Sequence, residues 1–226
     1  MGSQATKLED KSTFTLRKAD KSDLEDITTV AQAGFPDDPE FDYRFPKRDK
    51  YPEDNRKWIK REYQAYIEQP EKFTVMIVTT PVEKDGQVAS QAIALAVWDI
   101  SVLTEATGGD DGLQERRDVN RTHFEEFGKA MAKGFDDYFA CYGKEQVHLW
   151  LLATHPDFRR RGAGTMLCNW GTERATEKGW VLTVLASPMG NKLYQELGYK
   201  LVGQFTVRAD HEEESLEIYC LVKKTK

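Results

Sequence analysis

The order of elements in the last third of the chain constrains the fold most. Residues 147–154 are predicted to form a strand, and after a glycine-containing turn residues 163–178 are predicted to form a helix. Residues 180–186 are a continuous apolar run, which is typical of a strand buried on both faces of a sheet. A short helix that stops at a glycine and two antiparallel strands are expected next, at 189–197, 199–208 and 216–223. This order predicts an α/β protein with helices on both faces of one central, mixed and mostly antiparallel sheet.

The N-terminal half is predicted to add further strands and helices to this sheet. Asp20 is a residue type that caps helices, and apolar residues at helical spacing follow it. Asp85-Gly86 is a hairpin signal between two strand-like segments. The strands are expected at 13–19, 73–80 and 88–100, and a second helix around 58–67, ending before Pro70.

The segment 35–55 contains four prolines among aromatic and charged residues. Because proline interrupts helices and strands, an irregular loop is predicted here. Its aromatic residues predict a loop that packs against the protein, either as an ordinary surface loop or over the mouth of a substrate site. These residues are Phe35, Phe41, Tyr43, Phe45 and Tyr51.

Between the two halves lies an insertion. A Gly/Asp-rich loop is expected at 104–112, followed by a long amphipathic helix whose aromatic stripe is expected to belong to the core. The stripe consists of Phe124, Phe127, Met131, Phe135 and Tyr138. The whole chain, 1–226, is therefore interpreted as a single domain. It has an N-terminal half (12–100), a helical insertion between strands 3 and 4 (101–145) and a C-terminal half (146–226).

Composition narrows the class of protein. With 39% hydrophobic and 31% charged residues, the chain is typical of a globular protein with a solvated surface. The net charge of −6 disfavours a nucleic-acid partner, and no stretch approaches the roughly 20 apolar residues of a membrane span. The polar N-terminus lacks the apolar run of a signal peptide, so a cytoplasmic protein is expected.

Cysteine and histidine give little sign of metal or nucleophile chemistry. The three cysteines are widely separated, which suits a reducing compartment, and each is expected to be a small buried hydrophobe. They are Cys141, Cys168 and Cys220. No metal site is predicted. His123 and His211 lie among charged residues and are expected to be solvated.

The turn before the helix at 163–178 is the main candidate site. Gly162 and Gly164 lack a Cβ, so a diphosphate can approach the backbone closely. The first amides of the helix have no partners within it and carry partial positive charge, which makes a helix start a phosphate site. Three arginines precede the glycines: Arg159, Arg160 and Arg161. Leu167 and the absence of a Gly-Lys-Ser/Thr sequence exclude the dinucleotide fingerprint and the Walker loop.

A second motif follows one strand and one helix later. Together the two segments resemble the GNAT superfamily of acetyl-CoA-dependent N-acetyltransferases. The first matches the family's cofactor turn at Arg159, Gly162 and Gly164. The second matches at Ala186, Ser187, Pro188, Gly190, Leu193, Tyr194, Gly198 and Tyr199. The resemblance is close over residues 147–203, and the proline-rich segment resembles filamentous-fungal members.

The resemblance implies a fold and a cofactor site. The fold is a single GNAT-like domain, and acetyl-CoA is the co-substrate, bound by the C-terminal half. The strand before the turn is expected to splay from its neighbour, so that Leu152, Ala153 and Thr154 receive the pantetheine arm and an N–H near Leu152 polarises the thioester. The N–H groups of residues 160–165, which include Ala163 and Thr165, are expected to bind the pyrophosphate. Ser187 and Asn191 complete the expected cofactor contacts.

The resemblance also implies direct attack of an amine on the thioester. Tyr194 occupies the position of the family's general acid for the departing thiolate. His148 is the candidate base, with Asp99 through water as another and a satisfied core histidine as the alternative reading. In the related arylalkylamine N-acetyltransferases this strand carries two histidines; His148 matches the first, and Trp150 replaces the second.

The leading functional hypothesis is transfer of an acetyl group to the primary amine of a small molecule, with Tyr194 as acid and His148 or water as base. The alternatives are acetylation of protein lysines or N-termini and, in another class, a non-catalytic acyl-CoA-binding module. The chain is expected to be a monomer or a homodimer, without nucleic-acid or membrane partners.

Overall fold

The computed structural model describes residues 14–84, 86–104 and 112–225. Within them, seven strands form one sheet in the order β1-β2-β3-β4-β5-β7-β6. The strands are β1 (Thr15–Lys18), β2 (Phe73–Lys84), β3 (Gln87–Asp99), β4 (Gln146–Thr154), β5 (Val181–Ala186), β6 (Lys200–Arg208) and β7 (Ser215–Lys224). Of the described pairs, β4 and β5 run parallel and the others antiparallel, so the prediction of a mixed, mostly antiparallel sheet is confirmed.

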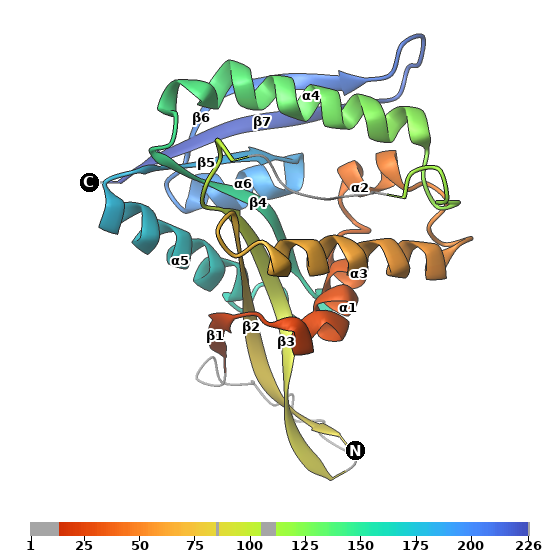
Figure 1. The fold of residues 1–226 in the computed structure, drawn as a ribbon, viewed down its shortest axis with the longest axis vertical. Helices are drawn as coiled ribbons and strands as arrows, with labels where there is room; N and C mark the ends of the chain where they lie inside the picture. Colours follow the sequence, from red (N-terminus) through yellow and green to blue (C-terminus); the bar gives the residue numbers. More distant parts are fainter. Residues whose placement is uncertain (1–13, 85, 105–111, 226) are drawn as a thin grey trace, which may run out of the picture.

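Helices cover both faces of the sheet, as predicted. One face carries α1 (Leu24–Gly34), α3 (Pro52–Glu68) and α4 (Arg121–Phe139). The other carries α5 (Ala163–Lys178) and α6 (Pro188–Glu196), whose side chains join a core with alternate residues of the central strands. The far ends of β2 and β3 extend as a ribbon beyond the body of the molecule (Figure 1). The long helix between strands 3 and 4 is confirmed as α4.

The proline-rich segment differs from the prediction of an irregular loop. It contains α2 (Pro39–Arg44), and Pro52 begins α3. Pro39 and Pro52 each stand in the first turn of a helix, where the N–H that proline lacks would have no partner within the helix. At this position proline therefore favours helix formation instead of breaking the helix. The Asp38 side chain caps α2 by accepting a hydrogen bond from the N–H of Glu40.

Most aromatic residues of this segment and of α4 lie in the core or pack against it. Phe41, Tyr43 and Phe45 are buried, which makes α2 a packed element and not a surface loop. The predicted aromatic stripe of α4 packs on the sheet and its neighbours. Gly134 allows α4 to approach β6 closely, because a Cβ there would lie 2.2 Å from the ring of Phe205.

Two predictions for individual side chains are wrong. His123 is buried, not solvated: its Nδ1 lies 2.8 Å from the carbonyl oxygen of Tyr43, and its ring stacks on the Tyr43 ring. Cys141 is exposed, whereas Cys168 is buried as expected. Among the described residues, no helix combines the length and apolar character needed to cross a membrane.

Candidate active site

The cleft at the centre of the sheet begins where two parallel strands separate. Pairing between β4 and β5 is confined to residues 146–149 and 181–184. Trp150 is an extra residue in β4, since Leu149 pairs with Trp98 and Leu151 with the adjacent Val97. Such a bulge bends the strand and re-aims its side chains. The remainder of β4 therefore pairs with β3 but leaves its other edge open to the cleft.

A cavity of about 490 Å³ occupies this opening. It runs from the separated strands to the turn before α5, and α6 closes its side. The predicted site residues that line it are Leu152, Ala153, Thr154, Arg159, Arg160, Gly162, Ala163, Gly164, Thr165, Ser187 and Tyr194. Arg161, Asn191 and His148 are not among its lining residues. The structure thus collects most of the predicted cofactor residues around one cleft.

The turn before α5 has the backbone shape that an anion site needs. Arg160 and Gly162 have positive φ angles of 63° and 96°, which directs successive amides away from ordinary strand or helix partners. Helix α5 begins at Ala163, and no side chain caps it. A Cβ at Gly162 would meet no atom within 4 Å, so the space before the helix start is open. These amides are available to a phosphate.

Arg159 has a structural task at the same place. Its guanidinium donates to the Asp37 carboxylate at 2.5 Å and to the carbonyl oxygens of Gly34 and Thr154 at 2.8 and 3.3 Å. It therefore fastens the end of α1 to the end of β4. These partners engage the Arg159 donors that were expected to contact a phosphate.

Ser187 links the two sides of the cleft. Its hydroxyl donates to Asp38 at 2.6 Å and accepts from the N–H of Gly190, which caps α6. Asp38 in turn caps α2, so one carboxylate joins the start of α2 to the start of α6. Asn191 instead accepts a hydrogen bond from Gln195 on the surface of α6.

Tyr194 lies on α6 and is 6% exposed, at the wall of the cleft. Burial raises the pKa of its phenol well above 10, and nearby acidic groups, including Glu40 and Asp38, raise it further. The phenol therefore keeps its proton across the physiological range. A protonated phenol facing the cleft is suited to give a proton to a strong base formed there.

His148 occupies a different environment. It is 3% exposed, lies against Phe135 and Phe139 of α4, and does not line the cleft. Burial, followed by the charge of Lys72, lowers its pKa to about 3. Its Nδ1 lies 2.9 Å from the Thr183 hydroxyl. Because that hydroxyl donates to Gln146, Nδ1 carries the proton of the neutral imidazole and donates it to the Thr183 oxygen.

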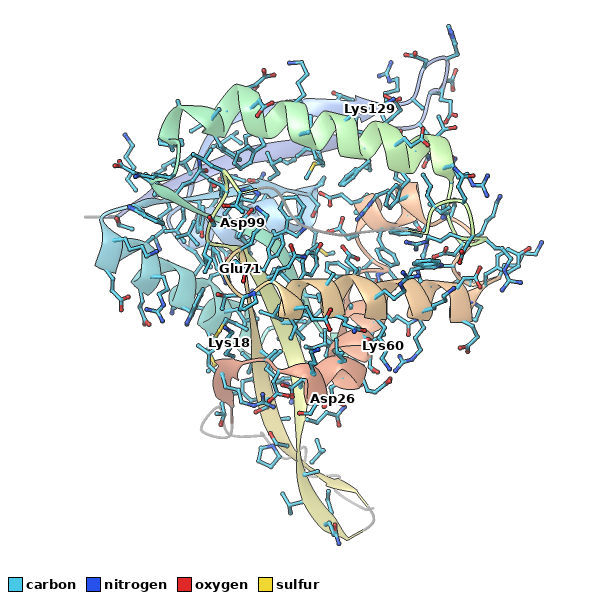
Figure 2. All side chains as sticks on the ribbon, viewed as in Figure 1. Lys18, Asp26, Lys60, Glu71, Asp99 and Lys129 are labelled. Atoms are coloured by element: carbon cyan, nitrogen blue, oxygen red, sulfur yellow. The ribbon has the colours of Figure 1, made fainter. Side chains whose placement is uncertain are left out.

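Asp99 is also held away from the cleft. It is 4% exposed and forms a 2.7 Å ion pair with Lys72, and it accepts from the N–H of Ser101. Figure 2 shows Asp99 near the middle of the molecule, whereas Lys129 lies on the outer side of α4. Asp99 thus has the contacts of a structural ion pair.

The structure adds residues that the sequence analysis did not select. Asp38 and Glu40, from the start of α2, line the cleft together with Phe35 and Trp150. Both acidic residues stand directly beside Pro39 in the sequence. Because this segment was interpreted as irregular, the directions of their side chains could not be predicted. A smaller cavity of about 60 Å³ lies beyond Glu40, between α1, α2 and α3.

Comparison with known proteins agrees with this geometry. Residues 122–201 match the family described as Acetyltransferase (GNAT) domain. A protein named Acetyltransferase from the fungus Stachybotrys chartarum is 25% identical over 201 residues, which cover 85% of this chain and 83% of the relative.

Solved structures share the fold. The mosquito arylalkylamine N-acetyltransferase like 5b superposes with a TM-score of 0.62 at 19% identity, covering 94% of this chain and 100% of that one. The histone acetyltransferase HPA2 and related acetyltransferase from Corynebacterium glutamicum has a TM-score of 0.59 at 19% identity, covering 95% and 97%. Residues 122–201 therefore carry a GNAT acetyltransferase domain, and the described residues share the fold of GNAT acetyltransferases.

Proposed function

We propose that this enzyme transfers the acetyl group of acetyl-CoA directly to the primary amine of a small molecule. The observation that carries the proposal is the single cleft that joins the open turn before α5, the free edge of β4 and the phenol of Tyr194. A pyrophosphate at the turn and a pantetheine arm along β4 would bring a thioester towards Tyr194. The mosquito arylalkylamine enzyme with the same fold supports a small amine as the acceptor.

Each part of the cleft has a task in this reaction. The amides of residues 160–165 bind the pyrophosphate, and the edge of β4 at Leu152, Ala153 and Thr154 holds the arm by backbone hydrogen bonds. An N–H near Leu152 donates to the thioester oxygen as negative charge develops on it. Ser187 orders the cleft wall through its bond to Asp38.

Bond formation and proton transfer then balance as follows. The neutral amine attacks the thioester carbon, the C–S bond breaks, and Tyr194 gives its proton to the departing sulfur. The nitrogen, which bears one proton too many after attack, loses it to the phenolate. No acyl-enzyme is needed, and the buried Cys168, whose pKa burial raises to about 12, is unsuited as a nucleophile.

The test is acceptor-dependent release of CoA thiol by the wild type and by Tyr194→Phe. We expect the wild type to release thiol with small primary amines, and the variant to lose at least tenfold in kcat, because a proton donor contributes roughly 10²–10⁴ in rate. Tyr199→Phe is the matched control, since its buried hydroxyl has no hydrogen-bond partner among the described residues and does not line the cleft.

Three outcomes would contradict parts of the proposal. Equal turnover by both tyrosine variants would remove Tyr194 from the role of acid. A strong preference for lysine peptides over free amines would replace the small-molecule acceptor with a protein one. Tight acetyl-CoA binding without turnover on any acceptor would support a binding module instead.

A further inference from the structure

The loop at residues 209–214, which joins β6 to β7, is held against the helices of one face at two points. At the first point, the N–H of Ala209 donates to the Tyr43 hydroxyl at 3.1 Å. At the second point, a carboxylate oxygen of Glu212 and Nε2 of His123 lie 2.5 Å apart. Because Tyr43 belongs to α2 and His123 to α4, the loop is fastened to both helices.

The His123 ring is 3% exposed and is held at both of its nitrogen atoms. Nδ1 lies 2.8 Å from the backbone carbonyl oxygen of Tyr43, and Nε2 faces Glu212. The ring also stacks on the Tyr43 ring, with the ring centroids 3.9 Å apart and the planes 6° from parallel. The imidazole therefore cannot turn away from either oxygen without losing this stack.

The two oxygen partners determine which protonation state of His123 fits the site. A carbonyl oxygen and a carboxylate oxygen only accept hydrogen bonds, whereas a neutral imidazole carries a single N–H. In either neutral tautomer, one ring nitrogen would present its lone pair to an oxygen. The imidazolium has an N–H on each nitrogen, so it satisfies Tyr43 and Glu212 together.

The charges near His123 favour the imidazolium. Burial lowers the pKa of His123, but its two hydrogen bonds and the negative charges of Glu212 and Glu214 outweigh burial. The pKa is therefore raised above its ordinary value of 6.5. Among the residues that the structure describes, His123 is the only cation paired with Glu212.

Other titratable groups on the packed elements act elsewhere or belong to the loop. Glu126 and Lys129 of α4 pair with each other, and the Arg44 guanidinium of α2 lies over the Phe127 ring. Burial raises the pKa of the Tyr43 phenol, so this group stays neutral when His123 titrates. The remaining charged or titratable side chains of these elements are Asp42 of α2, Arg121 and Glu125 of α4, and Asp210, His211 and Glu213 of the loop.

The loop is under strain that this contact offsets. His211 has a positive φ of 65°, a left-handed conformation that is costly for a residue with a Cβ. Glu212, Glu213 and Glu214 are consecutive and exposed, so like charges repel one another within the loop. The imidazolium attracts the first of these carboxylates and holds the loop against α4.

We propose that His123 and Glu212 form a pH-dependent latch, which holds the β6–β7 loop against α4 and α2 while His123 is protonated. When the imidazolium gives its proton to solvent, the Nε2 lone pair faces the Glu212 carboxylate and the loop separates from α4 there. The bond from Ala209 to the Tyr43 hydroxyl does not depend on this proton, so the loop stays attached at Ala209. The first residues of α2 line the cleft, so the latch acts on a helix of the cleft wall.

The direction of the pH effect follows from the raised pKa of His123. Its stabilising contribution is fully present below the unfolded value of 6.5 and is lost as the pH rises through the folded pKa. The latch is therefore closed at pH 6 and opens towards alkaline pH.

The experiment measures hydrogen–deuterium exchange of the loop from pH 6 to pH 9.5, corrected for the intrinsic pH dependence of exchange. The reference is the turn after α4, where the N–H groups of Gly143 and Glu145 donate to backbone carbonyls. The wild type is compared with Glu212→Gln, whose amide can donate to a neutral Nε2 or accept from a protonated one. Glu213→Gln is the matched control, and His211→Asn tests the other histidine of the loop with a residue type that tolerates a positive φ.

In the wild type, we expect exchange of the loop amides to rise about tenfold across this range, because a charge-assisted hydrogen bond is lost, while the reference turn stays unchanged. Glu212→Gln should remove this rise, because its contact with His123 survives in both protonation states. Glu213→Gln and His211→Asn should keep the rise.

Two results would overturn the proposal. Corrected exchange in the wild-type loop that follows the reference turn at every pH would show that the loop does not open. A rise that persists in Glu212→Gln, or that disappears in His211→Asn, would assign the pH dependence to another group.

Discussion

The buried carboxyl of Glu40 should make the protein less stable as the pH rises, and Glu40→Gln should remove that loss. The pKa of Glu40 is about 8 in the folded protein, against 4.5 for an unperturbed glutamate. A group whose pKa is raised on folding contributes stability that is fully present below the unfolded pKa and is lost as the pH approaches the folded pKa. The loss for the wild type therefore falls between about pH 4.5 and pH 8.

The size of this effect follows from the pKa values. Each unit of pH in that window costs about 1.4 kcal/mol of the free energy of unfolding. Between pH 5 and pH 7.5 the wild type should lose about 3 kcal/mol through Glu40 alone. Glutamine has the shape of the protonated acid and does not titrate. Its amide adds a cost of roughly 1–3 kcal/mol if it finds no partner, but that cost is the same at both pH values.

The assay is urea unfolding of the wild type, Glu40→Gln and Glu53→Gln at pH 5 and pH 7.5. The stability difference between Glu40→Gln and the wild type should move by about 3 kcal/mol in favour of the variant on going to pH 7.5. Glu53→Gln should show no such change, because its side chain is exposed. A difference that is the same at both pH values would refute the argument that burial raises the pKa of Glu40.

Two glycine substitutions test other parts of the structure, with Gly128→Ala, in open space on α4, as the control. Gly162→Ala should destabilise the turn by about 1–2 kcal/mol, because Gly162 has a φ of 96°, and should weaken acetyl-CoA binding in calorimetry. Gly171→Ala should lower stability by about 1–3 kcal/mol in thermal unfolding, because the new Cβ would lie 2.3 Å from the Trp98 ring. An unchanged affinity in the first variant, or an unchanged midpoint in the second, would contradict these readings.

The elements of the C-terminal half were predictable because local sequence determines them. Helix α5 occupies the predicted residues 163–178, and β5 the apolar run that ends at Ala186. The backbone shape of the turn involves only a few consecutive residues and requires glycines and small residues at fixed positions. The spacing of these residues in the sequence therefore predicts the turn directly. The turn after β4 lies beside Tyr194 of α6 because β5, the strand that leads into α6, pairs with β4.

The region around α2 and the smaller cavity was less predictable because it depends on contacts between distant segments. Proline was interpreted as a breaker in 35–55, yet Pro39 and Pro52 begin helices. The position of Glu40 at a cavity depends on how α2 packs between α1, α3 and β4, which no local pattern contains. His123 appeared solvated from its charged neighbours, but its partner carbonyl belongs to Tyr43, 80 residues earlier.

The separation of the two cavities along the chain has a consequence for how such an enzyme changes over time. The turn, the edge of β4 and Tyr194 all come from residues 149–196, whereas the smaller cavity is built almost entirely from residues 31–63, with Arg116 and Leu151. Under the proposed function, insertions or substitutions in the early segment would reshape the space beside the acceptor, whereas the segment proposed to hold the acyl donor lies elsewhere in the sequence. Changes in α3 can therefore alter the smaller cavity without altering the turn, the edge of β4 or Tyr194.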